Sequence, residues 1–188
     1  MILEGIVTSI APEGTLNVAP MGPRVEPSMD RFVLRPYKTA QTYRNLSHHG
    51  EGVLHVTDDA LLLARAAVGK LEPLPDVERA QCVLGYILRD ACRFYEFRVT
   101  AIDDREDRVT IEAETVHRGR LRDFFGFNRA KHAVVEAAIL ATRTAFLPPE
   151  EIAQEFRRLA VLVQKTGGPQ EQEAFRFLSE YVKAAQPL

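Results

Sequence analysis

The hydrophobic period of the chain changes after the stretch FFGFN at residues 124–128. Before this stretch, apolar residues mostly follow the period of two that strands require, and after it they recur at helical spacing. Strands followed by helices, rather than alternating with them, are typical of α+β proteins. The sequence therefore predicts an α+β chain in two parts, a strand-rich domain over residues 1–125 and a helical region over residues 126–188.

The strand-rich part contains two predicted hairpins. Residues 2–10 form an apolar run buried on both sides, the PEG turn at 12–14 follows, and TLNVAP at 15–20 is the partner strand. Residues 93–102 and 108–117 form a longer hairpin with an apolar face and a wet face that carries Glu96 and Glu112. RFVLRPY at 31–37 adds a strand that Pro36 must end. Several antiparallel strands interrupted by short helices predict a small barrel.

Two short helices interrupt these strands, separated by a strand at 52–56. The first is predicted from Thr39, as its N-cap, to His49, with Gly50 closing it. The second runs from a Thr57 cap to Gly69. Three longer helices follow in the second part, and the first of them carries an apolar stripe of Ala130, Val134, Ala137, Ala138 and Ala141. Three helices cannot bury all their apolar faces alone, so we expect them to pack on the barrel or on a second subunit.

Composition excludes several classes of protein. A chain of 188 residues with 46% hydrophobic residues can bury its own core, and 24 basic against 26 acidic residues give no field that favours nucleic acid or membrane surfaces. No signal peptide and no apolar run near the ~18 residues of a spanning helix is present. Cys82 and Cys92 form neither a disulfide framework nor a metal-ligand spacing. We therefore expect a cytoplasmic protein without a metal site.

The stretch NVAPMG is the first candidate site. A strand that runs into a proline loses a ladder hydrogen bond, and the small residues around it leave backbone groups approachable. Such an edge can present N–H and C=O groups to a flat heteroaromatic ring, although an ordinary turn explains the same residues. The candidate ring-binding residues are Asn17, Ala19, Pro20, Met21 and Gly22.

The second candidate is the start of the first helix. Lys38, Thr39 and Thr42 surround N–H groups that lack intrahelical partners, where the helix dipole favours an anion. An ammonium group and two hydroxyls there make a phosphate site, unless Thr39 is only a cap and Lys38 only a solvated side chain. A ring-binding edge and a phosphate-binding helix start together are what a flavin mononucleotide (FMN) site requires.

A third stretch, HRGRLRDFFGFNRAKH, mixes five cations with phenylalanines over residues 117–132. Basic and aromatic residues together can bind single-stranded nucleic acid, but the balanced charge of the chain argues against that partner. Arg129 and Lys131 are instead candidates for a second source of phosphate contacts. His117 and His132 flank the stretch, and no carboxylate at a diagnostic spacing pairs with either, so no catalytic acid or base is assigned. No P-loop, zinc motif or nucleophile elbow is present.

NVAPMG, KTAQTYRNL and VLHVTDDALLLARAAV together resemble the FMN-binding split-barrel superfamily, which includes the flavin reductases. In this resemblance Asn17, Ala19 and Pro20 match the segment that lines the isoalloxazine ring. Lys38, Thr42 and Asn45 approximate the phosphate-binding segment, with a stretched spacing. The resemblance implies a flavin-dependent oxidoreductase in which the flavin carries the hydride or electron step.

The chain is also similar, through GFNRAKHAVVEAAILATR and QKTGG, to the family named domain of unknown function 447. That similarity implies a six-stranded split barrel, a helical C-terminal region, a homodimer and FMN at or near the dimer interface, without a known reaction. Two alternatives stay open, a non-catalytic FMN carrier and a dimeric interaction module without cofactor. The small-molecule electron donor or acceptor is not specified, because no dinucleotide-binding fingerprint is present and a deazaflavin is an equal candidate.

Overall fold

The computed structural model describes residues 1–185, which divide into two compact units. The barrel unit comprises residues 1–57 and 74–124, and the helical unit comprises residues 58–73 and the chain from residue 125 onward. The boundary predicted at residue 125 leaves residues 58–73 with the strands, but in the structure their short helix packs with the C-terminal helices. The chain therefore passes from one unit to the other three times.

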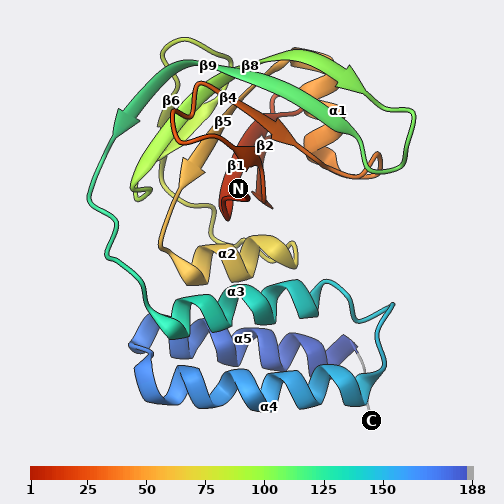
Figure 1. Cartoon of the computed structure of the whole chain (residues 1–188), viewed down its shortest axis with the longest axis vertical. Coiled ribbons are helices and arrows are strands. Elements are labelled where there is room, and N and C mark those ends of the chain that lie inside the picture. Colours follow the sequence, from red (N-terminus) through yellow and green to blue (C-terminus); the bar gives the residue numbers. More distant parts are fainter. Residues whose placement is uncertain (186–188) are drawn as a thin grey trace. The chain divides into compact units, whose positions relative to one another are not determined.

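A curled antiparallel sheet forms the barrel unit (Figure 1). In the described residues it has seven strands, in the order β2-β1-β5-β8-β9-β4-β3. Their bounds are β1 (Gly5–Ile10), β2 (Leu16–Met21), β3 (Arg24–Val25), β4 (Arg31–Leu34), β5 (Glu51–Val56), β8 (Arg93–Asp103) and β9 (Thr110–Arg120). The sheet thus has one strand more than the six expected. The additional strand is β3, which has only two residues. The N-terminal segment connects the two ends of the sheet, because Leu3 N–H donates to Pro23 O and Val25 N–H donates to Met1 O.

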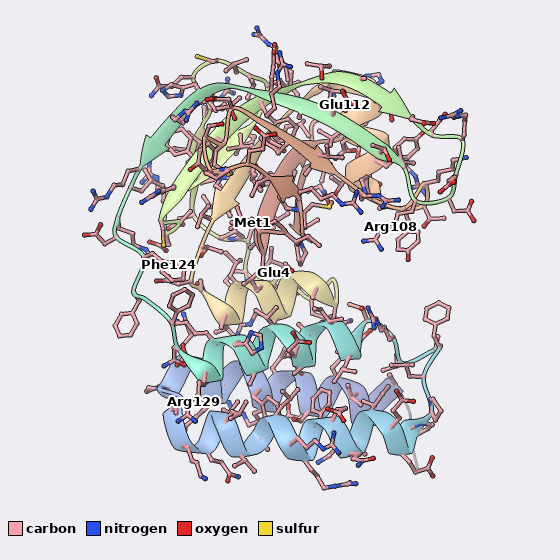
Figure 2. All side chains as sticks on the ribbon, in the orientation of Figure 1. Met1, Glu4, Arg108, Glu112, Phe124 and Arg129 are labelled. Carbon is pink, nitrogen blue, oxygen red and sulfur yellow. The ribbon has the colours of Figure 1, made fainter. Side chains whose placement is uncertain are left out.

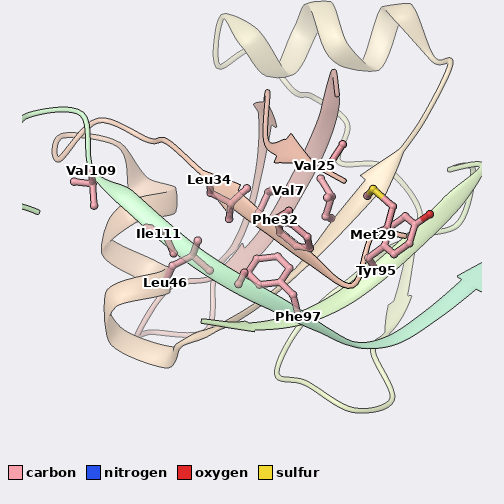
Figure 3. Packing of buried hydrophobic residues seen from close by; sticks show 12 residues of the cluster. Val7, Val25, Met29, Phe32, Leu34, Leu46, Tyr95, Phe97, Val109 and Ile111 are labelled. Carbon is pink, nitrogen blue, oxygen red and sulfur yellow. The ribbon is translucent and has the colours of Figure 1, made fainter. Parts of the chain in front are cut away.

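The inner face of the curled sheet holds the barrel core (Figure 3). Phe32 and Phe97 meet edge to face, with ring centroids 5.2 Å apart. Val7 and Leu34 are fully buried beside them. The predicted β1–β2 hairpin is confirmed, and every residue of β1 is buried, as expected for a strand covered on both sides.

Helix α1 (Gln41–His49) begins one residue later than predicted. Its N-cap is Ala40 rather than Thr39, because a turn in which Ala40 N–H donates to Tyr37 O delays the helix. No side chain caps the helix start. The predicted C-terminus is confirmed, since Gly50 adopts φ 69°, a left-handed conformation that glycine accepts without strain.

The long hairpin of β8 and β9 is confirmed, but its supposedly wet face is partly covered. Strands β6 (Val77–Arg79) and β7 (Tyr86–Leu88) form a separate two-stranded sheet that the sequence analysis did not anticipate. The loop between them, residues 80–85, contributes hydrogen bonds to side chains of β5 and β8. As a result Glu96, predicted to face solvent, is completely buried.

Within residues 1–185, the helical unit contains four helices: α2 (Ala60–Ala67), α3 (Arg129–Ala141), α4 (Pro149–Thr166) and α5 (Pro169–Ala185). Their shared core includes the predicted alanine stripe of α3, all of which is buried. Ala60 and Ala64 of α2 pack into the same core, so α2 supplies the additional apolar face that the three predicted helices required. The predicted Thr57 cap is wrong, because the Asp59 side chain accepts the Leu62 N–H at 2.9 Å instead.

In the part of the chain that the structure describes, every helix is too short or too polar to span a bilayer.

Candidate functional site

A buried polar cluster joins α1 to the β1–β2 hairpin. Asn17 Nδ2 donates to Ser9 Oγ at 3.2 Å and to Thr42 Oγ1 at 3.1 Å. Asn45 Nδ2 donates to Ser9 Oγ at 3.0 Å, and its side-chain oxygen accepts from Gln41 Nε2 at 2.7 Å. Ser9, Thr42 and Asn45 are buried, where a polar group left unpaired costs about 1–3 kcal/mol. The cluster therefore fixes the first turn of α1 against β2.

Three predicted site residues, Asn17, Thr42 and Asn45, thus come together in the structure. The sequence analysis assigned them to a ring edge and a phosphate site, and the structure shows them contacting one another directly or through Ser9. Thr42 is 2% exposed and Asn45 is not exposed at all. The contacts of Asn17, Thr42 and Asn45 orient the helix. Groups outside this cluster are therefore the ones available to bind a ligand.

The start of α1 offers such groups. Because Ala40 provides no side-chain cap, the first N–H groups of the helix are uncapped. Thr39 is exposed beside them and Lys38 is half-buried. The backbone N–H of Lys38 donates to Asp107 O at 2.9 Å, which holds this segment against the turn between β8 and β9. An ammonium group next to the positive end of a helix dipole suits an anion such as phosphate.

Arg108 is a second cation in this region that the sequence analysis did not identify (Figure 2). Tyr37 and Arg108 form an isolated antiparallel bridge, and the Arg108 guanidinium lies 5.5 Å from the centroid of the Tyr37 ring. Arg108 Nε also donates to Arg35 O at 3.3 Å. Arg108 is far from Lys38 in the sequence, so only the pairing of the two backbone segments reveals that they belong to one region.

The predicted ring-binding stretch lies on β2, which is an edge strand of the sheet. Asn17 faces α1, and the alternation of strand side chains places Ala19 and Met21 on the same face. Pro20 pairs with Ile6 in the ladder, and an edge strand tolerates its missing N–H. Gly22 is more crowded than expected, because a Cβ there would lie 3.1 Å from the Ile2 side chain.

Arg129 and Lys131 belong to the helical unit, where they begin α3. Lys131 Nζ donates to Glu171 Oε1 and to Asp58 O, both at 2.7 Å. Burial raises the pKa of Glu171, but hydrogen bonds from Lys131 and from the Gly168 amide outweigh burial, so the pKa lies below its ordinary value. The Lys131 ammonium is thus committed to an internal ion pair, whereas Arg129 is exposed (Figure 2).

His55 of β5 is a buried, neutral imidazole. Burial lowers its pKa from 6.5 to about 4. Nε2 accepts the Leu88 N–H at 3.1 Å, and Nδ1 lies 3.2 Å from Ile6 O, which assigns the proton to Nδ1. His55 therefore bridges β1 and β7, and its contacts are those of a core residue.

His117 has a carboxylate partner that the sequence analysis missed. Glu96 and His117 are paired residues of β8 and β9, with His117 Nδ1 2.8 Å from Glu96 Oε1. Burial raises the pKa of Glu96, but hydrogen bonds from the Gln81 amide, His117 and the Cys82 amide together bring it below its ordinary value. The predicted hairpin puts the two residues on neighbouring strands, but the register of the observed pairing, with its β-bulges, is what places them opposite each other.

The barrel unit also contains a pocket of about 470 Å³ on its β3–β4 side. Its lining combines polar and charged residues with part of the core, namely Arg24, Val25, Glu26, Arg31, Phe32, Val33, Thr100, Glu112 and Ala113. None of the predicted ring or phosphate residues lines this pocket.

The curled antiparallel sheet with its short helix α1 has a split-barrel fold, which it shares with solved structures. The structure of an FMN-bound protein from Methanosarcina mazei is similar over 96% of this chain and 94% of that chain, with a TM-score of 0.82 and 22% identity. The flavin reductase of styrene monooxygenase from Pseudomonas putida S12 is similar over 63% of this chain and 80% of that chain, with a TM-score of 0.50 and 12% identity. A 2-nitrobenzoate 2-nitroreductase from Pseudomonas fluorescens matches 62% of this chain and 64% of that chain, with a TM-score of 0.53 and 19% identity.

The family follows from the sequence models. An N-terminal domain model of the proteins of unknown function DUF447 matches residues 3–122, and a second DUF447 model matches residues 128–180. The chain belongs to the DUF447 family, which confirms the similarity expected from its sequence.

Proposed function

We propose that the chain binds FMN where β2 meets the start of α1, and that it acts as a homodimeric flavin-dependent oxidoreductase. The observation that carries the proposal is the uncapped start of α1, next to Lys38 and held against edge strand β2 by the Asn17–Thr42 hydrogen bond. The FMN-bound Methanosarcina mazei protein shares the fold of nearly the whole chain, which supports the choice of flavin.

In this proposal the residues divide into two groups. Lys38, Thr39 and the first N–H groups of α1 hold the phosphate, with Arg108 as an added cation. Ala19, Pro20, Met21 and the neighbouring backbone of β2 lie along the ring. Asn17, Thr42 and Asn45 fix the distance between ring edge and phosphate site through the polar cluster. The flavin, when bound, supplies the hydride or electron transfer.

Arg129, whose exposed side chain belongs to the helical unit, stays a separate candidate for an anion contact. Lys131 is the weaker member of the predicted pair, since its ammonium already binds Glu171. A reducing cytoplasm is the proposed location, and the reduced thiols of Cys82 and Cys92 are compatible with it.

The first test is to purify the protein without added cofactor, record its near-ultraviolet and visible absorption, and identify any released chromophore by mass. The twin bands of a flavin together with the mass of FMN are expected. A colourless protein that also fails to bind added FMN contradicts the proposal and leaves the interaction-module alternative.

The phosphate assignment is tested by comparing FMN with riboflavin, which lacks the phosphate. Lys38→Ala should weaken FMN binding at least tenfold, about 1.4 kcal/mol, and leave riboflavin binding unchanged. FMN and riboflavin binding are compared in the same way for Arg129→Ala. Lys70→Ala is the matched control, because Lys70 is an exposed lysine of the helical unit. An equal loss for both ligands argues against a phosphate contact.

The oxidoreductase assignment is tested separately, by adding NADH, NADPH or a reduced deazaflavin to the FMN-loaded protein without oxygen. Bleaching of the flavin by one donor at a rate faster than that of free FMN is expected. Bound FMN that no donor reduces faster than free FMN favours the carrier alternative. Light scattering during gel filtration tests the proposed dimer.

A further inference from the structure

The loop of residues 80–85 is attached to the outer face of the barrel sheet by two carboxylates. The backbone N–H groups of Gln81 and Cys82 donate to Glu96 Oε1 and Oε2 at 3.0 and 2.5 Å. The N–H of Leu84 donates to Glu51 Oε2 at 2.7 Å. Arg98 Nη2 completes the attachment by donating to Cys82 O at 3.0 Å. These bonds place the Cys82 side chain over the paired strands β8 and β9.

Cys82, Glu96 and His117 converge there. One ligand atom of each residue lies within 4.8 Å of a ligand atom of the other two. The three residues come from three different segments, namely the loop, β8 and β9. Glu96 is fully buried, His117 has 30% of its side chain exposed, and Cys82 is exposed. The convergence is therefore reachable from solvent on the Cys82 side.

We propose that Cys82, His117 and Glu96 form a binding site for Zn²⁺ or a similar transition-metal ion. A thiolate, an imidazole nitrogen and a carboxylate are the donors that zinc uses in proteins. Two anionic donors and one neutral donor balance the charge of a divalent ion. Water occupies the fourth position on the exposed side, as in sites with three protein ligands.

The geometry needs only a small adjustment to hold the ion. Zinc bond lengths of about 2.0–2.3 Å place tetrahedral donor atoms about 3.3–3.8 Å apart. In the structure the three donor atoms lie within 4.8 Å of one another, and rotation of the exposed Cys82 side chain is the adjustment that the proposal requires. Glu96 Oε2 accepts one hydrogen bond, from the Cys82 N–H, so it keeps a lone pair for the metal.

The same three side chains also resemble a nucleophilic cysteine with its base, but a sulfur, a nitrogen and a carboxylate oxygen that converge from three segments form the donor set of a metal site. His117 Nδ1 lies 2.8 Å from Glu96 Oε1, so the imidazole and the carboxylate already lie side by side, and an ion bound by both would replace the hydrogen bond between them. A divalent ion satisfies all three groups and locks the loop of residues 80–85 onto the sheet.

The test uses Co²⁺ as a spectroscopic substitute for Zn²⁺ in the full-length protein after chelator treatment. Difference spectra before and after Co²⁺ addition remove the contribution of any bound flavin. We expect one Co²⁺ per chain, with a thiolate-to-cobalt charge-transfer band in the near ultraviolet and strong visible bands of tetrahedral cobalt. Zn²⁺ should then displace Co²⁺ and abolish both sets of bands.

Variants identify the ligands. Cys82→Ser should remove the charge-transfer band, and Cys82→Ser and His117→Gln should each weaken Zn²⁺ binding at least tenfold by calorimetry. Cys92→Ser, at a buried thiol, and His132→Gln, at an exposed imidazole of the helical unit, should leave both readouts unchanged. Circular dichroism confirms that each variant folds. Absence of Co²⁺ uptake by the unmodified protein, or uptake with the same band in Cys82→Ser, overturns the proposal.

Discussion

Asn17 on β2 and Thr42 on α1 lie 25 positions apart in the sequence, and a hydrogen bond of 3.1 Å joins Asn17 Nδ2 to Thr42 Oγ1. This bond connects the two stretches that the sequence analysis had assigned to the ring and the phosphate of one ligand. Because Thr42 is buried, its hydroxyl serves the fold of the barrel unit as well as the proposed site.

Thr42→Val tests this bond with little change in side-chain shape. We expect the free energy of unfolding to fall by about 1–3 kcal/mol, because the Asn17 amide loses an acceptor in a mostly buried cluster. Thr42→Ser keeps the hydroxyl and should lose less than half as much. Urea unfolding followed by circular dichroism measures both, and a Thr42→Val protein as stable as the unmodified one would show that the hydroxyl contributes nothing.

The lowered pKa of His55 should make the free energy of unfolding depend on pH. Its pKa is about 4 in the folded protein against an ordinary 6.5, so in the intervening pH range the unfolded chain binds a proton that the folded chain does not. Stability is therefore fully present above pH 6.5 and is lost as the pH falls toward 4, by about 3 kcal/mol in total. Denaturant unfolding at a series of pH values measures the loss.

His55→Gln is the matched variant, because its amide can still donate to Ile6 O and accept from Leu88 N–H. Between pH 6.5 and 4.5 the buried carboxylates Glu96 and Glu171, with their lowered pKa values, stay ionised. The variant should lose most of the pH dependence in this range. An unchanged slope would assign the effect to another group.

Gly119 of β9 should not tolerate alanine. A Cβ there would lie 2.4 Å from two ring carbons of Phe94, which is buried against Val53 and Ile87. We expect Gly119→Ala to lower the free energy of unfolding by about 1–3 kcal/mol through overpacking. The double variant Gly119→Ala with Phe94→Leu should cost less than the two single changes combined, since the smaller side chain leaves room for the new methyl group. Additive losses would argue against a direct clash.

Lys131 should contribute to the stability of the helical unit. Lys131→Met leaves the Glu171 carboxylate mostly buried without its cation, and we expect a loss of about 3 kcal/mol. Adding Glu171→Gln should recover part of that loss, because no charge is then left unpaired. Thermal and urea unfolding measure both variants. A Lys131→Met protein with unchanged stability but weakened FMN binding would instead restore Lys131 to the phosphate site.

Much of the fold could be predicted because strand and helix periods are local properties. The hairpin of residues 5–21, the hairpin of β8 and β9, and the alanine stripe of α3 all follow from spacing within one segment. The cap predictions at Thr39 and Thr57 were wrong. At each position a neighbouring interaction, the Tyr37–Ala40 turn in one and the Asp59 side chain in the other, fixes the helix start further along the chain.

The candidate site was predictable only in its parts. The sequence indicated Asn17, Lys38 and Thr42 by residue type, but it could not show that Asn17 and Thr42 bond to each other. Arg108 was missed because its position beside Tyr37 depends on a long-range backbone pairing.

The sequence by itself determined the α+β class, the two main hairpins, the C-terminal helices and the residue types available for a flavin. Only the tertiary structure decided which of those residues meet. Alternation placed Glu96 on a face that the sequence analysis took to be wet, and a loop from elsewhere in the chain buries it beside Cys82 and His117. The physical reason is that the spacing of apolar residues specifies the side of a strand or helix on which a residue lies. Whether that residue is buried, and which charged group it pairs with, depends on the distant segment that covers that side.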